Sequence, residues 1–547
     1  MNRDLQKKLR FGEIKKFIYG RAIFLLLGFL AQFVLMMIAY YKLSNYSFWF
    51  YILFLIISVV SIIDIYNDGG NPDMKLSWML LIAILPVFGA IFYATIQSRP
   101  GTRKLRISIQ EQRKINASYL HKPAGLAERM AEEDPRMAGL VKYLNDYDGG
   151  ILYTNTEAEY FPIGEAQFTA MKRELEKAEK FIFIEFFIVC EGKMLDDLLE
   201  ILWRKALEGV EIRFLYDGTN MLINLPSYFS KLIEREGMKA KAFAPIRMVF
   251  SPHYNNRDHR KILVIDGQVA FTGGINIADE YINEKERFGH WKDTGVMLRG
   301  DAVERMTYLF LEMWNASGKP EEDLGQYRTC RRKEQSISGQ VEEYALGVDH
   351  AMEHATDANR MTGYAQGYVV PYSVSPLGRE RVGEKVYLDL IDTAHRYLHI
   401  MTPYLILDHQ MIDALTYAAK RGVDVKIIMP HIPDKPYAFV LAKTYYNQLL
   451  EAGVQIYEYE PGFVHAKVMV ADDEKAVVGT VNMDYRSLYH HFECGVLFYR
   501  HSVIAQVEAD VQDTLTKSIP ATKDDYKNQK WYVRLQGRLM RFIAPLM

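Results

Sequence analysis

Two distant segments of the chain share a histidine, a lysine and an aspartate at one spacing, set among apolar residues. The segments are "HRKILVID", which contains His259, Lys261 and Asp266, and "HAKVMVAD", which contains His465, Lys467 and Asp472. An imidazole titrates near neutral pH, so it can act as a nucleophile, an acid or a base. The repeated pattern therefore indicates a site for covalent or acid–base catalysis.

Strand geometry assigns different roles to the three side chains of each motif. In a β-strand, side chains two residues apart point to the same face, so each histidine and its lysine are expected to face one site. Asp266 and Asp472 lie seven residues after their histidines, an odd offset that turns them away. The "DG" and "DDE" that begin at these aspartates are typical of hairpin turns. We count both aspartates with the catalytic motif but expect them to fix the end of the strand.

Each motif is followed by a second apolar segment that ends in small residues and an asparagine. These segments are "AFTGGIN", ending at Asn276, and "AVVGTVN", ending at Asn482. Glycine lets the backbone approach a ligand, and an amide can donate a hydrogen bond to a phosphate oxygen. We therefore predict that both asparagines bind phosphate. One such motif is a weak signal, but two with the same continuation are a strong one.

The two motifs belong to two copies of one α/β unit. In the first copy, residues 172–188 and 198–218 each change from a charged helical pattern to an apolar strand. In the second copy, residues 389–406 and 414–430 do the same. Each copy then reaches its His-x-Lys segment. Alternating helix and strand patterns predict sheets covered by helices.

Length and composition indicate a folded protein of more than one domain. A chain of 547 residues exceeds a single ordinary core. Its 49% hydrophobic and 24% charged residues exclude a disordered protein. The net charge of −2 gives no general attraction to nucleic acid. The three cysteines are far apart and form neither a zinc pattern nor a disulfide framework.

We expect six segments along the chain. They are a membrane leader with two or three transmembrane helices (1–105), a connecting segment (106–164), the first α/β domain (165–316), a polar linker (317–345), the second α/β domain (346–517) and a basic amphipathic segment (518–547).

The leader contains three apolar stretches, Ala22 to Tyr41, Ser47 to Ile63 and Leu76 to Ile96. Each approaches the roughly 20 residues that a helix needs to cross a bilayer. We therefore expect a multi-pass membrane protein. Basic residues precede the first stretch and follow the third, and basic flanks favour the cytoplasmic side of a membrane. Three full crossings would place these two flanks on opposite sides, so both cannot be cytoplasmic. Two effective crossings and a cytoplasmic catalytic region are the favoured topology.

The chain ends in "WYVRLQGRLMRFIAPLM", in which arginines recur at helical spacing among apolar residues. Such a helix is suited to an anionic membrane surface. A terminal helix that packs on its own domain is the equally good alternative.

The paired motifs resemble those of the phospholipase D superfamily over about residues 165 to 515. More narrowly, the chain is similar to bacterial cardiolipin synthases. The segments that carry this likeness are "NPDMKLSWMLLIAILPVFG", "NNRDHRKILVIDGQVAFTGGINIADEY", "TPYLI" and "HAKVMVADDEKAVVGTVNMDYRSL". The resemblance implies two tandem α/β/α domains with pseudo-twofold symmetry, preceded by N-terminal transmembrane helices, with both motifs at one site.

The resemblance also implies a two-step phosphatidyl transfer. One histidine attacks phosphorus, and the other protonates the departing alcohol and later deprotonates the incoming one. By analogy, His259 is expected to be the nucleophile and His465 the acid and base. The two motif lysines and the two asparagines would hold the phosphate oxygens. The implied reaction converts two phosphatidylglycerol molecules to cardiolipin and glycerol.

The resemblance further implies that a carboxylate downstream of each motif orients an imidazole. The matching residues are Asp293 in "HWKDTGV" and Glu493 in "HFECGV". Ordinary turn acids are the alternative for both. Glu185 in "FIEFFI" and Tyr404 in "TPYLI" are weaker candidates for binding glycerol hydroxyls, and packing accounts for them about as well.

We predict no cofactor and no metal, because no cysteine or acidic cluster near His490 and His491 in the sequence completes a metal site. The predicted partners are phosphatidylglycerol and anionic membrane lipid, with no nucleic acid, and an oligomer is compatible with the sequence. A membrane-anchored hydrolase or headgroup-exchange enzyme fits the motifs equally. Near-neutral charge counts against a nuclease, and two intact motifs count against an inactive scaffold.

Overall fold

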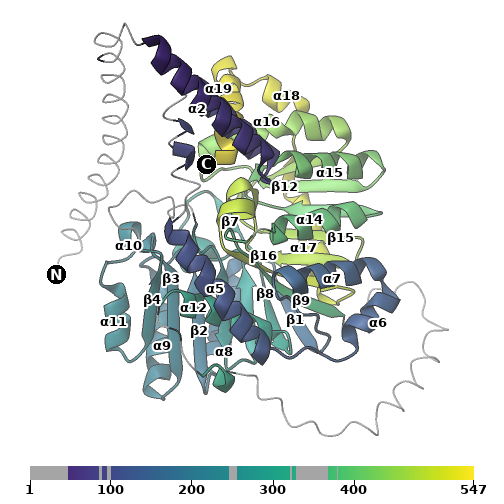
Figure 1. Ribbon diagram of the computed structural model, residues 1–547. Helices are drawn as coiled ribbons and strands as arrows, with labels where there is room; N and C mark the ends of the chain where they lie inside the picture. Colours follow the sequence, from purple (N-terminus) through teal and green to yellow (C-terminus); the bar gives the residue numbers. More distant parts are fainter. Residues whose placement is uncertain are drawn as a thin grey trace.

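The structure is a computed structural model (Figure 1). It describes residues 38, 47–85, 89–90, 92–94, 100–245, 256–318, 320, 323–327, 367–378 and 380–546. Most of the predicted linker and of the first apolar stretch lies outside these residues. The predicted domain boundaries stay predictions.

The first half of the chain forms a seven-stranded mixed sheet in the order β1-β8-β6-β5-β2-β3-β4. Its strands are β1 (Thr156–Phe161), β2 (Phe181–Phe186), β3 (Glu211–Asp217), β4 (Lys239–Phe243), β5 (Lys261–Ile265), β6 (Val269–Gly273) and β8 (Gly295–Gly300). Strands β2, β3 and β4 are parallel, and β5 is antiparallel to β2. Strands β5, β6, β8 and β1 continue the sheet in antiparallel pairs.

The second half forms an eight-stranded sheet in the order β19-β13-β12-β10-β15-β16-β18-β9. Its strands are β9 (Tyr368–Val374), β10 (Tyr397–Met401), β12 (Asp424–Pro430), β13 (Gln455–Tyr459), β15 (Val468–Ala471), β16 (Lys475–Gly479), β18 (Glu493–Tyr499) and β19 (Ser518–Pro520). Apart from the added β19, the order and the directions of the strands repeat those of the first sheet. The predicted pair of α/β domains is therefore confirmed.

Helices cover the two sheets. Those of the first half are α8 (Gly164–Leu175), α9 (Lys193–Leu207), α10 (Asn220–Ile223), α11 (Phe229–Arg235) and α12 (Val303–Ala316). Those of the second half are α14 (Val382–Thr393), α15 (His409–Lys420), α16 (Pro436–Ala452) and α17 (Val503–Thr516). Short helical turns are η3 (Asp279–Ile282), η4 (Gly325–Tyr327) and η6 (Arg486–His490).

Three apolar cores hold these layers together. One lies between the first sheet and helices α8, α9 and α11. A second lies between the second sheet and helices α14, α15 and α16. The third contains α12, α17 and residues of both sheets, so it joins the halves. Because burying apolar surface stabilises by about 25 cal/mol per Å², this shared core resists separation of the halves.

Two short strand pairs lie outside the large sheets. Strand β11 (Leu405–Ile406) pairs with β17 (Met483–Asp484) within the second half. Strand β7 (His290–Lys292) of the first half pairs in parallel with β14 (Gly462–Val464) of the second. An isolated parallel bridge joins Asp258, just before the first motif, to Phe492, which follows the second motif. Backbone pairing thus joins the halves next to each of the two motif histidines.

The N-terminal region forms α2 (Ser47–Asn67), α3 (Pro72–Ile84), α5 (Pro100–Tyr119), α6 (Leu126–Glu133) and α7 (Pro135–Tyr147). Proline at the first position and Asn71 as the N-cap begin α3. The Asn71 amide donates to Asp408 at 3.0 Å and to the Tyr489 hydroxyl at 2.6 Å, so the leader is docked on the second half. Within the described ranges, no helix combines the length and apolarity required of a membrane span. The number of crossings stays a prediction.

The C-terminal region forms α18 (Lys523–Lys527), α19 (Trp531–Ile543) and the turn η7 (Ala544–Leu546). Helix α19 packs on α16, where a Cβ added to Gly537 would meet Thr444 and the Arg541 guanidinium lies 4.3 Å from the Tyr445 ring centre. In Figure 1, α2 and α19 lie near each other at the top, over the second half. The terminal helix therefore packs on its own domain and still presents a free face.

Candidate active site

The two motif histidines lie on extended segments just before their strands, since β5 begins at Lys261 and β15 at Val468. Each is held by a backbone hydrogen bond from the opposite half. The His259 amide donates to the Phe492 carbonyl at 2.9 Å, and the His465 amide donates to the Lys292 carbonyl at 2.7 Å. The backbone pairing between the halves described above thus fixes the position of both imidazoles.

His259 is buried against residues that follow the second motif. Its Nδ1 lies 2.8 Å from Oε2 of Glu493, and the Thr480 hydroxyl donates to the same oxygen at 2.5 Å. The ring of Phe187 packs edge-on at a centroid distance of 4.8 Å. These contacts leave Nε2 as the ring nitrogen without a carboxylate partner, which is the nitrogen a nucleophile would use.

His465 has the corresponding surroundings at the other end of the site. Its Nδ1 lies 2.7 Å from Oδ2 of Asp293, and the rings of Trp291 and Tyr281 pack at 5.3 and 5.4 Å. A Cβ added to Gly274 would collide with the Asp293 carboxylate and approach the His465 carbonyl at 2.9 Å. The glycine therefore makes room for this pair, whereas the sequence had suggested room for a ligand.

Each imidazole is thus oriented by a carboxylate from the opposite half of the chain. His259 of the first half pairs with Glu493 of the second, and His465 of the second pairs with Asp293 of the first. Both carboxylates are fully buried. Sequence reasoning named the two acids but did not show which histidine each serves, because the pairing depends on how the halves meet.

Burial and neighbouring cations set the charges of the site. Burial and then Lys261 hold the pKa of His259 well below its usual value. Burial and then Lys467 lower the pKa of His465 to about 4, against the opposing effect of Asp293. Burial also raises the pKa of Glu493 above its usual range. Both imidazoles are therefore neutral at pH 7 in the free protein, as a nucleophile and a base require.

The motif lysines lie behind the histidines in the same buried space. Lys261 Nζ donates to the His259 carbonyl at 2.6 Å, and Lys467 Nζ donates to the His465 carbonyl. Burial lowers the pKa of Lys261 to about 8 and that of Lys467 to about 7. The charge of each lysine also affects the pKa of His259, so the two motifs share one electrostatic site.

The side-chain amides of the two asparagines differ in their hydrogen bonds. Asn276 accepts from the Ile188 amide at 2.9 Å and donates to the Tyr281 hydroxyl at 2.8 Å, so much of its amide serves the local structure. Asn482 is buried, and its Oδ1 has no hydrogen-bond partner among the described residues. Phosphate binding stays a prediction for both.

The two motif aspartates lie at hairpin turns, as their odd offset predicts. Asp266 and Asp472 adopt left-handed backbone angles, with φ of 54° and 58°. The Asp266 carboxylate accepts three backbone N–H groups at 2.8 Å from residues 179–181. The Asp472 carboxylate accepts three from residues 395–397, at 2.6 to 2.9 Å. Each aspartate therefore joins its hairpin to the start of a neighbouring strand.

Glu185 lies in strand β2 and is fully buried. It forms an ion pair with Arg260 at 2.5 Å, and burial raises its pKa well above the usual value. Arg260 also pairs with Asp258 at 3.3 Å. The carboxylate is thus used in a buried charge cluster, in which its partner Arg260 directly follows His259.

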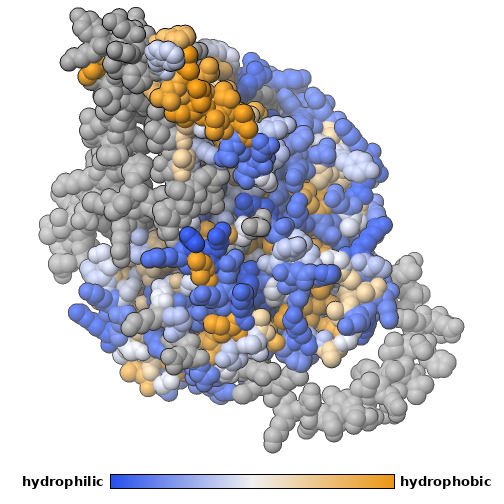
Figure 2. Space-filling view, viewed as in Figure 1, coloured by the Kyte–Doolittle hydropathy of each residue, from blue (hydrophilic) through white to orange (hydrophobic). Residues whose placement is uncertain are grey.

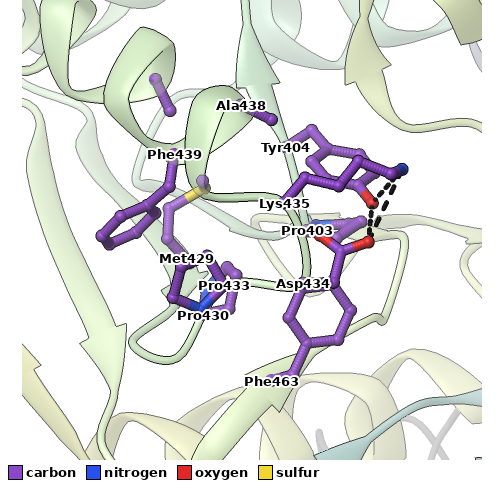
Figure 3. A pocket seen from close by; sticks show the side chains of 11 residues that line it. Pro403, Tyr404, Met429, Pro430, Pro433, Asp434, Lys435, Ala438, Phe439 and Phe463 are labelled. Atoms are coloured by element: carbon purple, nitrogen blue, oxygen red, sulfur yellow. Dashed lines mark hydrogen bonds and ion pairs between the residues drawn. The ribbon is translucent and has the colours of Figure 1, made fainter. Parts of the chain in front are cut away.

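Tyr404 lines a pocket of the second half with an apolar floor (Figure 3). Its hydroxyl donates to Asp434 at 2.6 Å and accepts from Lys435 at 2.9 Å. Figure 3 shows these three on one side and Met429 and Phe439 on the other. The lining also includes Phe463, whose ring lies 5.8 Å from that of His465. The pocket therefore lies next to one of the two motif histidines.

A third histidine, His491, lies beside the other motif histidine, His259. Its ring is 5.3 Å from the His259 ring, and its Nδ1 is 3.7 Å from Oε1 of Glu493. Sequence reasoning set this residue aside because no acid or cysteine cluster lies near it in the chain. The fold supplies the missing partners, His259 and Glu493. The only signal in the sequence was its position two residues before a carboxylate already singled out.

The model for "Cardiolipin synthase, PLD-like domain" matches residues 171–314 and 387–515, one match in each half. The model for "Phospholipase_D-nuclease N-terminal" matches residues 56–96. The fold resembles the crystal structure of phosphatidylserine synthase from Haemophilus influenzae Rd KW20, with a TM-score of 0.53 at 14% identity, over 75% of this chain and 99% of that one. Fold and paired motifs together define a protein with two phospholipase D-like domains.

Similar full-length sequences narrow this class. A cardiolipin synthase of Halalkalibacterium halodurans is 31% identical, over 90% of this chain and 92% of its own. One of Alkalihalophilus pseudofirmus is 32% identical over the same shares. The chain belongs to the family of cardiolipin synthases built from phospholipase D-like domains.

Proposed function

We propose that the protein is a cardiolipin synthase, which transfers a phosphatidyl group from one phosphatidylglycerol to another and releases glycerol. The observation that carries the proposal is the pair of buried imidazoles, each with its own carboxylate at 2.7 to 2.8 Å, beside two lysines. Such a site contains a nucleophile, an acid and cations for the phosphate, which together are sufficient for transfer through a covalent intermediate.

In the first step, Nε2 of His259 attacks phosphorus and the bond from phosphorus to the glycerol oxygen breaks. With the Glu493 carboxylate as acceptor, the proton of His259 resides on Nδ1 and the lone pair on Nε2. Protonated His465 gives its proton to the departing oxygen, so that glycerol leaves neutral. The product is a phosphatidyl-histidine.

In the second step, His465 takes a proton from the hydroxyl of the second phosphatidylglycerol. The hydroxyl oxygen then attacks phosphorus, the phosphorus–nitrogen bond breaks, and cardiolipin forms. His465 ends the cycle protonated and His259 ends it neutral. One proton therefore moves in and out of the same nitrogen, as microscopic reversibility requires.

Both lysines act first in substrate binding and then in the transition state. A bound phosphodiester is an anion, so it raises the pKa of nearby Lys261, Lys467 and His465 toward the charged form. The lysine charges then stabilise the negative charge that develops on the phosphate oxygens. Because the groups are buried, these interactions are stronger than they would be in water.

The electrostatic environments support His259 as the nucleophile. The main influences on its pKa, burial and the surrounding lysines and histidines, all lower it and keep the ring neutral. Burial and Lys467 also lower the pKa of His465, but Asp293 opposes this effect. The histidine that holds a proton more readily is the better acid.

Exposed apolar residues of the N-terminal region, which is docked on the second half, support a membrane-attached enzyme. Helix α2 exposes Phe48, Trp49, Ile56 and Val60, and its side chains form the large apolar patch at the top of Figure 2. Exposed apolar patches of this extent mark interaction surfaces. In this proposal α2 meets the lipid of the bacterial cell membrane, and the catalytic part lies on the cytoplasmic side.

The C-terminal helix extends this surface with charge. Helix α19 exposes Trp531, Leu535 and Leu539, and Arg534 and Arg538 lie on the same helix. Arginines near an anionic bilayer contribute about 1 kcal/mol each to binding. The pocket of Tyr404 lies at the N-terminus of α16, the helix on which α19 packs.

The test is conversion of phosphatidylglycerol vesicles by the purified full-length chain, with lipid products and free glycerol measured together. We expect cardiolipin and glycerol in equal amounts, in the presence or absence of a chelator. Phosphatidic acid as the sole product would instead assign a hydrolase, and exchange into added alcohols alone would assign a headgroup-exchange enzyme. His465→Asn, which keeps a polar side chain but no base, is the control for contaminating activity.

A further inference from the structure

His491 is a buried polar side chain that the proposed reaction leaves without a task. Its side chain is 7% exposed, and neither ring nitrogen has a hydrogen-bond partner among the described residues. Buried imidazole nitrogens are normally paired, because an unsatisfied polar atom costs free energy. The orphaned nitrogens therefore indicate a partner other than the described residues.

The groups around His491 are those that bind metals. One ligand atom each from His259, His491 and Glu493 lie within 4.8 Å of one another. Glu493 Oε1, the oxygen nearer His491, also lacks a hydrogen-bond partner among the described residues. The other oxygen is held by His259 and Thr480, so the orientation of the carboxylate is fixed.

The spacing of the unpartnered atoms suits a transition metal. His491 Nδ1 and Glu493 Oε1 are 3.7 Å apart, too far for a hydrogen bond. Two ligand atoms on a tetrahedral zinc ion, each about 2.1 Å from the metal, lie about 3.4 Å apart. Two imidazoles and one carboxylate with an open fourth position are a common zinc ligand set.

We propose that His491, His259 and Glu493 form a binding site for a divalent transition-metal ion of the zinc class, and that its occupancy inhibits the enzyme. A metal held by Glu493 and a ring nitrogen of His259 removes the acceptor and the free imidazole that the nucleophile needs. The inhibition rests on the proposed function, whereas the binding does not. The ion is an inhibitor in this inference and takes no part in transfer.

The opposite end of the site supplies an internal comparison. Trp291 occupies the position two residues before Asp293 that His491 occupies before Glu493. Its ring packs on His465 at the same 5.3 Å centroid distance. Since an indole offers no lone pair to a metal, only the His259 end can bind the ion.

Binding is tested with Co²⁺, whose visible absorption reports a tetrahedral nitrogen and oxygen site, on the purified full-length chain. We expect one ion per chain, displaced by Zn²⁺, and loss of the absorption in His491→Phe and in Glu493→Gln. His409→Asn, on the exposed start of α15, is the matched control and should keep it. An unchanged spectrum in His491→Phe would overturn the site. This readout does not depend on activity, so it separates failure of the site from failure of the proposed function.

Inhibition is tested by titrating Zn²⁺ into the vesicle assay. We expect reversible inhibition that a chelator relieves. The rate of each protein is expressed as a fraction of its own rate without Zn²⁺. On this scale, half-inhibition of His491→Phe should need at least a tenfold higher Zn²⁺ concentration than half-inhibition of the unchanged protein. Equal sensitivity of the two proteins would overturn the inhibitory role. If His491→Phe does not fold, the smaller and polar His491→Asn is used in both experiments.

Discussion

The two ends of the active site have the same backbone frame and different surroundings. At one end, His259 meets Glu493, Thr480 and His491, which is a polar environment. At the other end, His465 meets Asp293 and a set of aromatic rings that includes Trp291. The backbone bonds that hold the two histidines are equivalent, at 2.9 and 2.7 Å.

This difference shows how a duplicated frame can support two unlike tasks. The duplication delivers two imidazoles with matched positions and directions. The residues two positions before each carboxylate then make the ends unequal. In the proposed mechanism the nucleophile and the acid need different proton affinities, and unequal surroundings allow such a difference while the backbone positions stay equivalent.

Replacing each histidine is the strongest way to break the equivalence of the ends. We expect His259→Ala to lose about 10⁴-fold or more in kcat on every substrate, because no intermediate forms. His465→Ala should lose about 10²- to 10⁴-fold on phosphatidylglycerol. With a p-nitrophenyl phosphatidyl ester it should still form the intermediate, since nitrophenolate leaves without protonation. Mass spectrometry should then find the adduct on His259 of this variant, and an adduct on His465 in His259→Ala would reverse the roles.

Replacing the carboxylates tests whether each histidine is oriented by the carboxylate of the opposite half. Glu493→Gln and Asp293→Asn should each lower kcat by about 10²- to 10⁴-fold, because each imidazole loses the acceptor that sets its tautomer. In ¹⁵N-histidine spectra, Glu493→Gln should move the Nδ1 resonance of His259 and leave that of His465, and Asp293→Asn should do the reverse. Shifts confined to the histidine of the same half would contradict the pairing.

The lysines give a smaller effect that depends on pH. Burial lowers the pKa of Lys467 to about 7 and of Lys261 to about 8, so the cations exist below these values and are lost as pH rises. We expect kcat/KM to fall above pH 7 and more steeply above pH 8. The decline of kcat should begin at a higher pH than that of kcat/KM, because the bound phosphodiester raises the pKa values of both lysines. Lys467→Arg should remove the first step of the decline, and an unchanged profile would exclude Lys467 as its source.

The hairpin aspartates should affect stability far more than catalysis. Asp266→Ala and Asp472→Ala each remove an acceptor of three backbone N–H groups, and each should cost about 2 kcal/mol of unfolding free energy. Asp266→Asn is the matched control, because asparagine keeps an acceptor and tolerates the left-handed backbone. Urea unfolding in detergent measures the difference. A loss of kcat per folded molecule like that of the histidine variants would place the aspartates in the chemistry.

Features that depend on local periodicity could be predicted from the sequence. The repeated helix and strand patterns gave two equivalent sheets, and the odd offset of Asp266 and Asp472 predicted their hairpin positions. These features follow from spacing along one strand. The convergence of both motifs was implied by family resemblance, and the crossed strand pairs account for it physically.

Features that depend on contacts between segments far apart in the sequence could not be predicted. Nothing near His491 in the sequence indicates His259, which lies 232 positions earlier. Glu185 looked available at a strand end, but Arg260 comes from a neighbouring strand segment and pairs with it. The space beside Gly274 is filled by Asp293 and not by a ligand. In each case the deciding neighbour comes from another strand or from the opposite half.

The exchange of carboxylates between halves makes the protein a natural split enzyme. Produced as two polypeptides divided within residues 328–366, each fragment would carry an imidazole whose acid resides on the other fragment. Neither fragment could turn over alone, and mixing them would restore the reaction by complementation. For the same reason, loss of either repeat would also remove the carboxylate that orients the histidine of the other.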